Sequence, residues 1–304
     1  SLGDVAYDRL YQELIQLETA HPDLVTIDSP GRVVGGGAMV ARSSKVKHFM
    51  PMLSLDAVHD RDELRSWHQL LSRRLELPSQ QQLDLVCEEK IDGVAVALSY
   101  EHGVLVRAAT RGDGRWGEEI TANVRMIKSI PLRLKLEQPL EQPPVWCEIH
   151  GEAFIPDDSF AAINQEREQQ GEARFASPRN ACAGTLRQLD PRIVARRQLE
   201  FFAHSLHLSE PTVGPGSQWE MLSWLQSVGF WVSPNRRFCT DLADVESFFR
   251  RWERDRRLLP YATDGVMVKL DDLRLQRKLW AGRKSPVWAT VVRDLSPAKQ
   301  EGAS

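Results

Sequence analysis

Hydrophobic side chains recur at every second residue between positions 83 and 110, and this pattern restricts the fold more than any other feature of the sequence. Leu83–Glu88 predicts a buried strand, and Gly93–Tyr100 continues the two-residue period. After a short turn, Val104–Thr110 returns with the same period. We therefore expect an antiparallel hairpin that is preceded by a buried strand.

The rest of the chain mixes helical and strand patterns in no regular order. Helical patterns cover Asp4–Ala20, Asp60–Leu75, Glu118–Ile127, Asp157–Gln170, Trp219–Val228 and Asp241–Arg257, with helical or turn-like segments over Arg179–Leu189 and Pro191–Arg197. Further strands are expected over Val145–Ile155, Leu199–Leu206 and Gly265–Leu270. Because strands and helices do not alternate as βαβ units, the sequence predicts an α+β fold built on antiparallel sheets.

Composition excludes several classes of protein. The 304 residues include 39 Lys+Arg and 42 Asp+Glu, for a net charge of -3, and 42% are hydrophobic. These values exclude a disordered or collagen-like chain and a protein with one dominant basic face. No apolar run approaches the roughly 18 residues of a membrane span, and no signal segment is visible, so we expect no membrane contact.

The four cysteines lie far apart in the sequence and form no C-x-x-C pair. We expect them to be buried as small hydrophobic side chains, without a zinc site or a disulfide scaffold. This pattern fits a reducing cytoplasm.

Lys90 is predicted at the end of the first buried strand, in a turn that enters the next strand, within the sequence Glu88–Gly93 (EEKIDG). Taken alone, this segment also fits a surface turn with a solvated lysine. However, Arg111 follows the hairpin, Glu152 lies on a later strand, and residues 264–269 place an acid and a lysine on another strand. Cations neutralise phosphate charge, and carboxylates bind Mg²⁺ and hydroxyl groups, so these residues together favour phosphoryl chemistry.

At this point the sequence resembles a known family, the adenylation domain of bacterial NAD-dependent DNA ligases. The resemblance covers roughly residues 4–293. It rests on Met52–Asp56, Cys87–Gly93, Ala109–Gly114, Gly117–Arg125, Pro178–Asn180, Gly184–Arg192 and Asp264–Lys269. The fold that it implies is the antiparallel-sheet nucleotidyltransferase (ATP-grasp-like DNA ligase adenylation) fold with a small helical N-terminal element.

The resemblance also implies a reaction, that of an NAD-dependent DNA ligase (EC 6.5.1.2 class). Lys90 would attack the α-phosphate of NAD, release nicotinamide mononucleotide (NMN) and become lysyl-AMP. The AMP would then pass to the 5′-phosphate of nicked double-stranded DNA, and a 3′-hydroxyl would displace it. NAD as the AMP donor and Mg²⁺ are the expected cofactors.

Roles follow from the resemblance position by position. It implies that Lys90, Asp92 and Lys269 are catalytic. It implies that the nucleotide is bound by Ser54, Leu55, Glu88, Arg111, Glu152, Arg179, Arg187, His204, Arg256, Asp264, Lys269 and Arg293, and that NMN is bound by Asp4, Tyr7 and Asp8. No protein ligand to a metal is expected.

Four positions depart from the family pattern. Histidines stand at His150 and His204, where the family usually has arginine and tyrosine, Arg293 replaces a lysine, and Glu89 replaces a hydrophobic residue. A catalytically impaired paralog that binds nucleotide or nicked DNA is therefore the alternative function. An ATP-using ligase or capping enzyme is a third hypothesis, which the Arg179–Arg192 segment and the Asp4–Asp8 segment oppose.

The expected domain organisation has two parts. Residues 1–45 are predicted to form a partial helical NMN-binding element and a linker, and residues 46–304 the nucleotidyltransferase domain. The OB-fold, zinc-finger, helix-hairpin-helix and BRCT domains of the family are not expected in this chain. We therefore expect a cytoplasmic monomer that binds nicked DNA weakly by itself.

Overall fold

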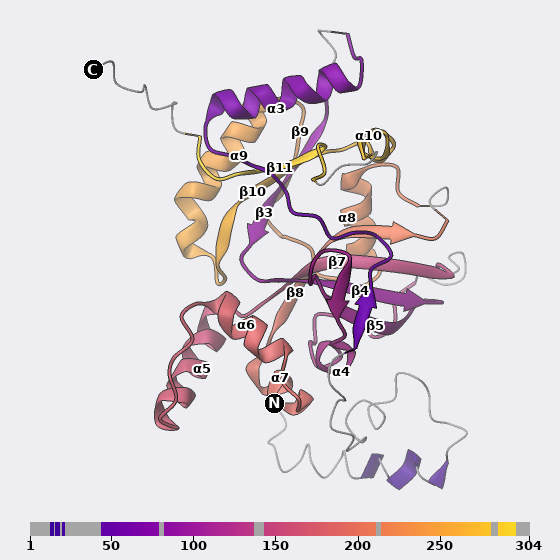
Figure 1. Cartoon of the computed structure of the whole chain (residues 1–304), viewed down its shortest axis with the longest axis vertical. Coiled ribbons are helices and arrows are strands. Elements are labelled where there is room, and N and C mark those ends of the chain that lie inside the picture. The colour runs from indigo at the N-terminus through magenta and orange to yellow at the C-terminus, as the bar shows by residue number, and fades with distance from the viewer. Residues whose placement is uncertain are drawn as a thin grey trace.

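The computed structural model describes residues 13–14, 16–18, 20–21, 44–78, 82–136, 143–210, 214–280 and 285–295. Two large sheets form its centre (Figure 1). The predicted α+β fold with antiparallel sheets is confirmed, since all strand pairs but one are antiparallel. Within the predicted helix Asp4–Ala20, residues 13–14, 16–18 and 20 are helical, and the others lie outside the described residues.

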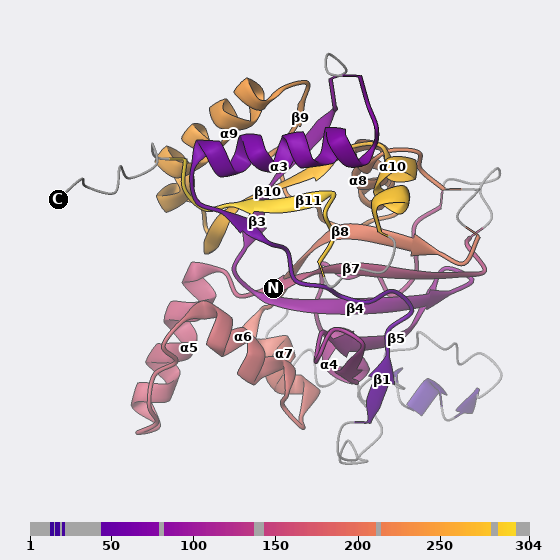
Figure 2. The same cartoon turned by 45° about the horizontal axis from the view of Figure 1, so that its top comes forward.

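The first sheet has five strands, and helices cover it on one side. Its order is β2 (Ala57–Val58), β11 (Ala289–Val292), β10 (Thr263–Leu270), β3 (Leu85–Ile91) and β9 (Arg236–Cys239). Helices α3 (Arg61–Arg74) and α9 (Leu242–Asp255) share one hydrophobic cluster with this sheet (Figure 2). The Asp60 side chain caps α3 by accepting a hydrogen bond from the Glu63 amide.

The second sheet has four strands and lies next to the first. Its order is β5 (Val104–Thr110), β4 (Val94–Glu101), β7 (Trp146–Phe154) and β8 (Glu200–Leu208). A small ribbon of β1 (Lys45–Lys47) and β6 (Trp116–Glu118) lies nearby. From residue 44 onward, the other helices of the described residues are α4 (Thr121–Val124), α5 (Asp157–Gln169), α6 (Pro178–Leu186), α7 (Pro191–Arg197), α8 (Gln218–Ser227) and α10 (Leu273–Leu279), with a 3-10 turn η2 at Arg256–Leu258.

Strand β3 lies between the hydrophobic cores of the two sheets, and its side chains point alternately into one and the other. Leu85 and Cys87 join the cluster under α3 and α9, whereas Val86 joins the core of the four-stranded sheet. Because side chains alternate along a strand, Glu88 and Lys90 point, like Val86, toward the second sheet. The chain then turns at Asp92 and enters β4 of that sheet.

One predicted element is wrong. The sequence predicts a helix over Glu118–Ile127, but residues 116–118 form strand β6 and only Thr121–Val124 is α-helical. Glu118 pairs with Lys45 of β1, and its amide donates to Thr110 Oγ1 at 3.0 Å. Pairing with a distant segment therefore replaces the first turn of the expected helix.

Two further expectations concern cysteines and the membrane. All four cysteines are buried free thiols, as predicted. In the part of the chain that the structure describes, no helix combines the length and the apolar character that crossing a bilayer requires.

Candidate active site

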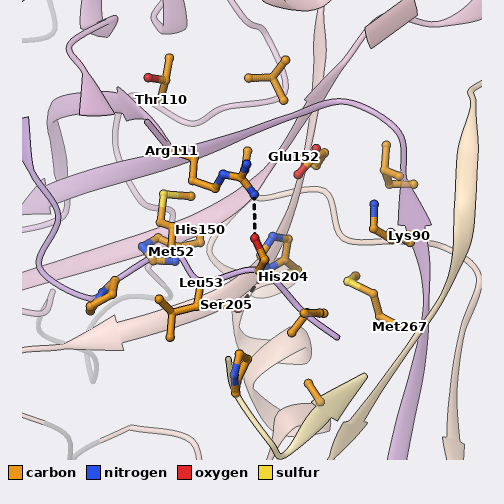
Figure 3. Close-up of a pocket in the computed structure, with 18 of the residues that line it drawn as sticks. Met52, Leu53, Lys90, Thr110, Arg111, His150, Glu152, His204, Ser205 and Met267 are labelled. Carbon is orange, nitrogen blue, oxygen red and sulfur yellow. Dashed lines mark hydrogen bonds between the residues drawn. The ribbon is translucent and has the colours of Figure 1, made fainter. Parts of the chain in front are cut away.

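A cleft of about 720 Å³ lies between the two sheets and is lined by residues from both. Lys90 and Met267 face it from the five-stranded sheet, and His150, Glu152 and His204 face it from the four-stranded sheet (Figure 3). Most of the residues predicted for the nucleotide site therefore line one cavity.

Lys90 is the penultimate residue of β3, so a rigid strand holds it and not a turn. Its Nζ lies 3.3 Å from Oδ2 of Asp264, at the start of β10. Both guanidinium nitrogens of Arg293 bind the same carboxylate, at 3.0 and 2.9 Å. The predicted nucleophile and two predicted site residues thus form one charged cluster at the cleft.

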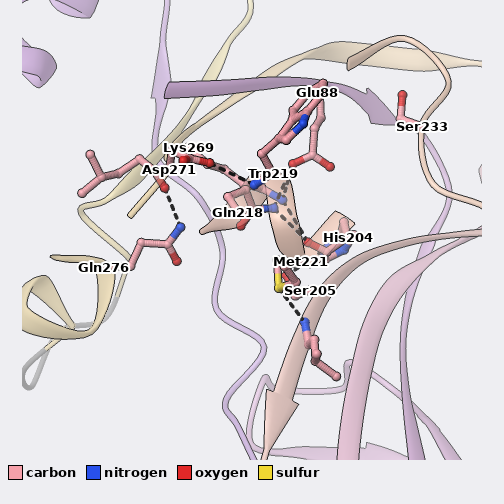
Figure 4. Close-up of polar contacts among 12 residues, drawn as sticks. Glu88, His204, Ser205, Gln218, Trp219, Met221, Ser233, Lys269, Asp271 and Gln276 are labelled. Carbon is pink, nitrogen blue, oxygen red and sulfur yellow. Dashed lines mark hydrogen bonds and ion pairs between the residues drawn. The ribbon is translucent and has the colours of Figure 1, made fainter. Parts of the chain in front are cut away.

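Lys269 is held by a different carboxylate, deeper in the protein. Its Nζ lies 2.8 Å from Oε1 of Glu88 and donates to the backbone oxygen of His204 at 3.2 Å (Figure 4). The amide nitrogen of Gln218 donates to Glu88 Oε1 at 3.1 Å and to the His204 oxygen at 3.3 Å. These bonds tie β3, β8, α8 and β10 together at one end of the cleft.

Asp92 orders the crossing between the sheets. Its amide donates to the Ala262 oxygen at 2.9 Å, and its carboxylate binds Arg179 at 3.2 Å. Gly93 follows, and a Cβ placed there would lie 2.1 Å from the Ala153 oxygen. Only glycine therefore allows β4 to begin this close to β7.

Arg111 and Glu152 face the cleft from the four-stranded sheet. Arg111 reaches the Ser54 hydroxyl at 3.4 Å, and Ser54 and Leu55 also line the cleft. Burial raises the pKa of Glu152 to about 7, although the nearby cations Lys90, Arg179 and Arg111 oppose that shift. Glu152 is thus a carboxyl group that gains or loses a proton near neutral pH.

The cleft also contains neutral histidines. Burial lowers the pKa of His204 well below its ordinary value, and the Lys269 ammonium lowers it further. Burial likewise lowers the pKa of His207 to about 3. Both imidazoles are therefore uncharged at neutral pH and present flat aromatic faces.

The structure does not bring every predicted residue into the cleft. Arg187 lines its rim but pairs with Glu118 at 3.3 Å. Arg256 stacks on Trp252, with the guanidinium carbon 5.1 Å from the ring centroid, and does not line the cleft. The three residues expected to bind NMN, Asp4, Tyr7 and Asp8, lie outside the described residues.

Sequence reasoning missed the polar groups that support these residues. Gln218 was not predicted, because an amide at the start of a helical pattern is indistinguishable from a surface residue. The buried carboxylate of Glu89 was treated only as a departure from the family pattern. In the structure it accepts hydrogen bonds from Tyr261 at 2.9 Å and from Asn235 at 3.0 Å, and burial raises its pKa.

Two family models match this sequence, and together they cover most of it. The model of the NAD-dependent DNA ligase adenylation domain matches residues 40–293. The model of the DNA ligase-like, N-terminal NAD+-binding domain matches residues 1–35. The chain belongs to the NAD-dependent DNA ligase adenylation-domain family. The resemblance inferred from the motifs is therefore confirmed.

Curated relatives of this adenylation domain are named DNA ligase. The proteins of Synechococcus sp. (strain CC9605) and (strain CC9902) are 58% and 56% identical to the chain over 292 and 294 residues. These alignments cover 96% of the chain but 42% of each relative, so the chain spans less than half their length. A solved structure described as mycobacterial DNA ligase D complexed with ATP and MES aligns with a TM-score of 0.36 and 18% identity, over 69% of this chain and 54% of that one, which is too weak to support an argument.

The adenylation domain offers few protein ligands for a metal. Within the described ranges, no group of three or more His, Cys, Asp or Glu side chains is arranged to hold a metal ion. Glu152 and Asp264 nevertheless line the cleft, and carboxylate oxygens suit Mg²⁺. Such a site fits Mg²⁺ that is held mainly by substrate phosphates and water.

Proposed function

We propose that the cleft binds the AMP portion of NAD and that Lys90 becomes covalently adenylated. The observation that supports this best is the position of Lys90 in a cleft whose walls also present Arg111, Arg179, Lys269 and Arg293. A nucleophilic amine surrounded by cations suits attack on a phosphate ester.

The proposed step transfers AMP from NAD to the Lys90 amine. The Lys90 ammonium separates from Asp264 and releases a proton to solvent water, and the free electron pair of the amine attacks the α-phosphorus of NAD. A second proton leaves the nitrogen to water as the new bond forms. A phosphorus–nitrogen bond forms, and the phosphorus–oxygen bond to NMN breaks, so that NMN leaves with the electron pair. Arg293 holds Asp264 in place by its bidentate contact, which keeps that carboxylate beside Lys90.

The surrounding residues have proposed roles that the family resemblance implies. His204 stacks on the adenine, Glu88 contacts the adenine edge, and Arg111 and Glu152 hold the ribose. The resemblance assigns Arg179 and Lys269 to the phosphates. Asp92 fixes Arg179 at the cleft, whereas Lys269 is held by Glu88, the residue assigned to the adenine edge. Ser54 and Leu55 line the nucleotide, with Arg187 at the rim. Mg²⁺ would neutralise phosphate charge beside them.

We also propose the remaining steps of strand sealing for this chain, although its named relatives are more than twice as long. The AMP passes from Lys90 to the 5′-phosphate of nicked DNA, and a 3′-hydroxyl then displaces it, which seals the strand. Residues 1–45 would belong to an NMN-binding element and residues 46–304 to the nucleotidyltransferase domain. We also infer a cytoplasmic location, because the four thiols are free and the proposed substrates are NAD and DNA. The expected monomer stays a prediction.

Nucleotide choice tests the proposal. The protein is incubated with Mg²⁺ and either NAD or ATP, and its intact mass is measured. One added AMP with NAD and none with ATP is the expected result. Equal labelling by ATP would remove the NAD assignment, and no labelling by either would favour the catalytically impaired paralog.

A further inference from the structure

Residues 48–56 form an irregular segment, here named the strap, that crosses the cleft between the two sheets. It begins after β1, which pairs with β6, and ends at β2, which pairs with β11 of the five-stranded sheet. The strap residues 50–55 line the cleft. Because the strap has no strand partner along its length, its backbone amides need other acceptors.

The ends of the strap are bound by backbone groups. The His48 amide donates to the Arg115 oxygen at 3.0 Å, and the Met52 amide donates to the Gly114 oxygen at 2.8 Å. At the other end, the Asp56 oxygen accepts from the Val291 amide at 3.0 Å. The amides between His48 and Met52 have a different partner.

That partner is the side chain of Glu148, in the middle of β7. Its Oε2 accepts from the Phe49 amide at 3.1 Å, and its Oε1 accepts from the Met50 amide at 3.2 Å. His150 Nε2 lies 2.8 Å from the same Oε1. Glu148 is 1% exposed, so these bonds replace its hydration. Burial opposes its charge, but the bonds from His150 and the two amides hold the pKa of Glu148 below its ordinary value.

The first residues on one face of β7 contact the strap directly or through Glu148. Trp146, Glu148 and His150 are two residues apart and therefore lie on the same face of the strand. The Trp146 ring packs on Phe49 with centroids 4.4 Å apart, and the His150 ring packs on His207 with centroids 4.5 Å apart. His150 also lines the cleft (Figure 3).

We propose that Glu148 is a positioning residue that clamps the strap, so that Ser54 and Leu55 are in place before the nucleotide binds. The effect of this clamp on catalysis rests on the proposed function, because it assumes that the cleft binds NAD. Charge-assisted bonds to backbone amides are directional and strong, so they select one strap conformation. An unclamped strap would have to be ordered when the nucleotide binds, which weakens binding without changing the reacting groups.

Hydrogen–deuterium exchange of the free protein tests the clamp without any nucleotide. Two variants are compared with wild type: Glu148→Gln keeps the size and removes the charge, and Glu148→Asp keeps the charge and shortens the side chain. Glu172→Gln, at an exposed residue of a surface ion pair, is the matched control. Exchange is followed in a peptide that contains residues 48–52 and in one from β4.

Strap exchange is expected to be at least about tenfold faster in both Glu148 variants, with β4 and the Glu172→Gln protein unchanged. Unchanged strap exchange in both variants would overturn the clamp. Equal acceleration in the strap and in β4 would also overturn it, because that pattern means a general loss of stability.

A second measurement separates the clamp from the reaction. In the self-adenylation assay, the variants should raise the NAD concentration for half-maximal rate about tenfold and change the maximal rate little. Faster strap exchange with an unchanged NAD requirement would overturn the positioning role. A wild type that gains no AMP would refute the proposed function instead, and the exchange result would be unaffected.

Discussion

The ammonium of Lys269 lies 2.8 Å from the carboxylate of Glu88, and the two side chains are only 4% and 2% exposed. The pair joins β10 to β3 at the closed end of the cleft, two residues before Lys90. Two buried charges of opposite sign are costly to separate, because each would remain in a site without water. The pair therefore couples the stability of the sheet to the geometry of the candidate site.

Removing one member of this pair should destabilise the protein strongly. Lys269→Met leaves the Glu88 carboxylate buried and unpaired, and we expect a loss of about 3–5 kcal/mol in the free energy of unfolding. Urea denaturation measures it. The double variant Lys269→Met/Glu88→Gln should recover a large part of that loss, and strictly additive losses would contradict the pairing.

Glu152 should make stability depend on pH between about 4.5 and 7. Its pKa is raised in the folded protein from 4.5 to about 7, mainly by burial, so the folded state binds the proton more tightly than the unfolded state does. The stabilisation that Glu152 contributes is fully present below its pKa in the unfolded state. It is lost as the pH rises through its pKa in the folded state.

Glu152→Gln removes this titration. The difference in unfolding free energy between the variant and wild type should change in favour of the variant by on the order of 1–3 kcal/mol as the pH rises from 4.5 to 8. Denaturation of both proteins across that range, with Glu172→Gln as the control, measures the difference. A constant difference between Glu152→Gln and wild type would show that folding does not raise the pKa of Glu152.

A methyl group at Gly93 should disturb the crossing from β3 to β4. The added Cβ would lie 2.1 Å from the Ala153 oxygen, so the strands must separate, and we expect Gly93→Ala to cost about 2–3 kcal/mol of stability. Gly216→Ala is a suitable control, because its nearest neighbour is the end of the Glu220 side chain at 3.4 Å. Equal thermal denaturation of the two variants would contradict the steric explanation.

The sequence predicts those helices and strands that are determined by neighbouring residues. The two-residue period at residues 83–110 correctly predicts β3, β4 and β5. However, β3 extends to Ile91, so Lys90 lies on a strand and not in the predicted turn. Strand β6 was missed because its partner is Lys45, more than 70 residues away. The contacts of Glu148 with the Phe49 and Met50 amides also join segments far apart in the sequence. The sequence around Glu148 therefore does not predict them.

The candidate site was predicted mainly through its motifs. Lys90, Glu152, Asp264 and Lys269 line one cleft, as the resemblance implies. Arg256 does not, because its guanidinium stacks on Trp252 at the end of α9. Exposed arginines have many partners of similar energy, so sequence position alone does not fix where such a side chain points.

DNA binding by this chain should be weak and sensitive to salt. Its net charge is -3, so only a local basic surface can meet the phosphates. We expect the logarithm of the binding constant for nicked duplex to fall with the logarithm of salt concentration with a slope of about -2 to -4, as for a few phosphate contacts. A titration by fluorescence anisotropy at several salt concentrations measures this slope. Tight binding with an affinity independent of salt concentration would contradict the predicted weak electrostatic binding.

Covalent labelling of Lys90 is the central claim, and mass spectrometry tests it most directly. Wild type and Lys90→Arg are incubated with NAD and Mg²⁺, and their intact masses and peptide maps are recorded. Arginine keeps the positive charge but does not become a free amine, so it cannot attack phosphorus. We predict one AMP on wild type, located at Lys90, and none on Lys90→Arg. An AMP adduct on Lys90→Arg, or a wild-type adduct on another residue, would contradict the claim.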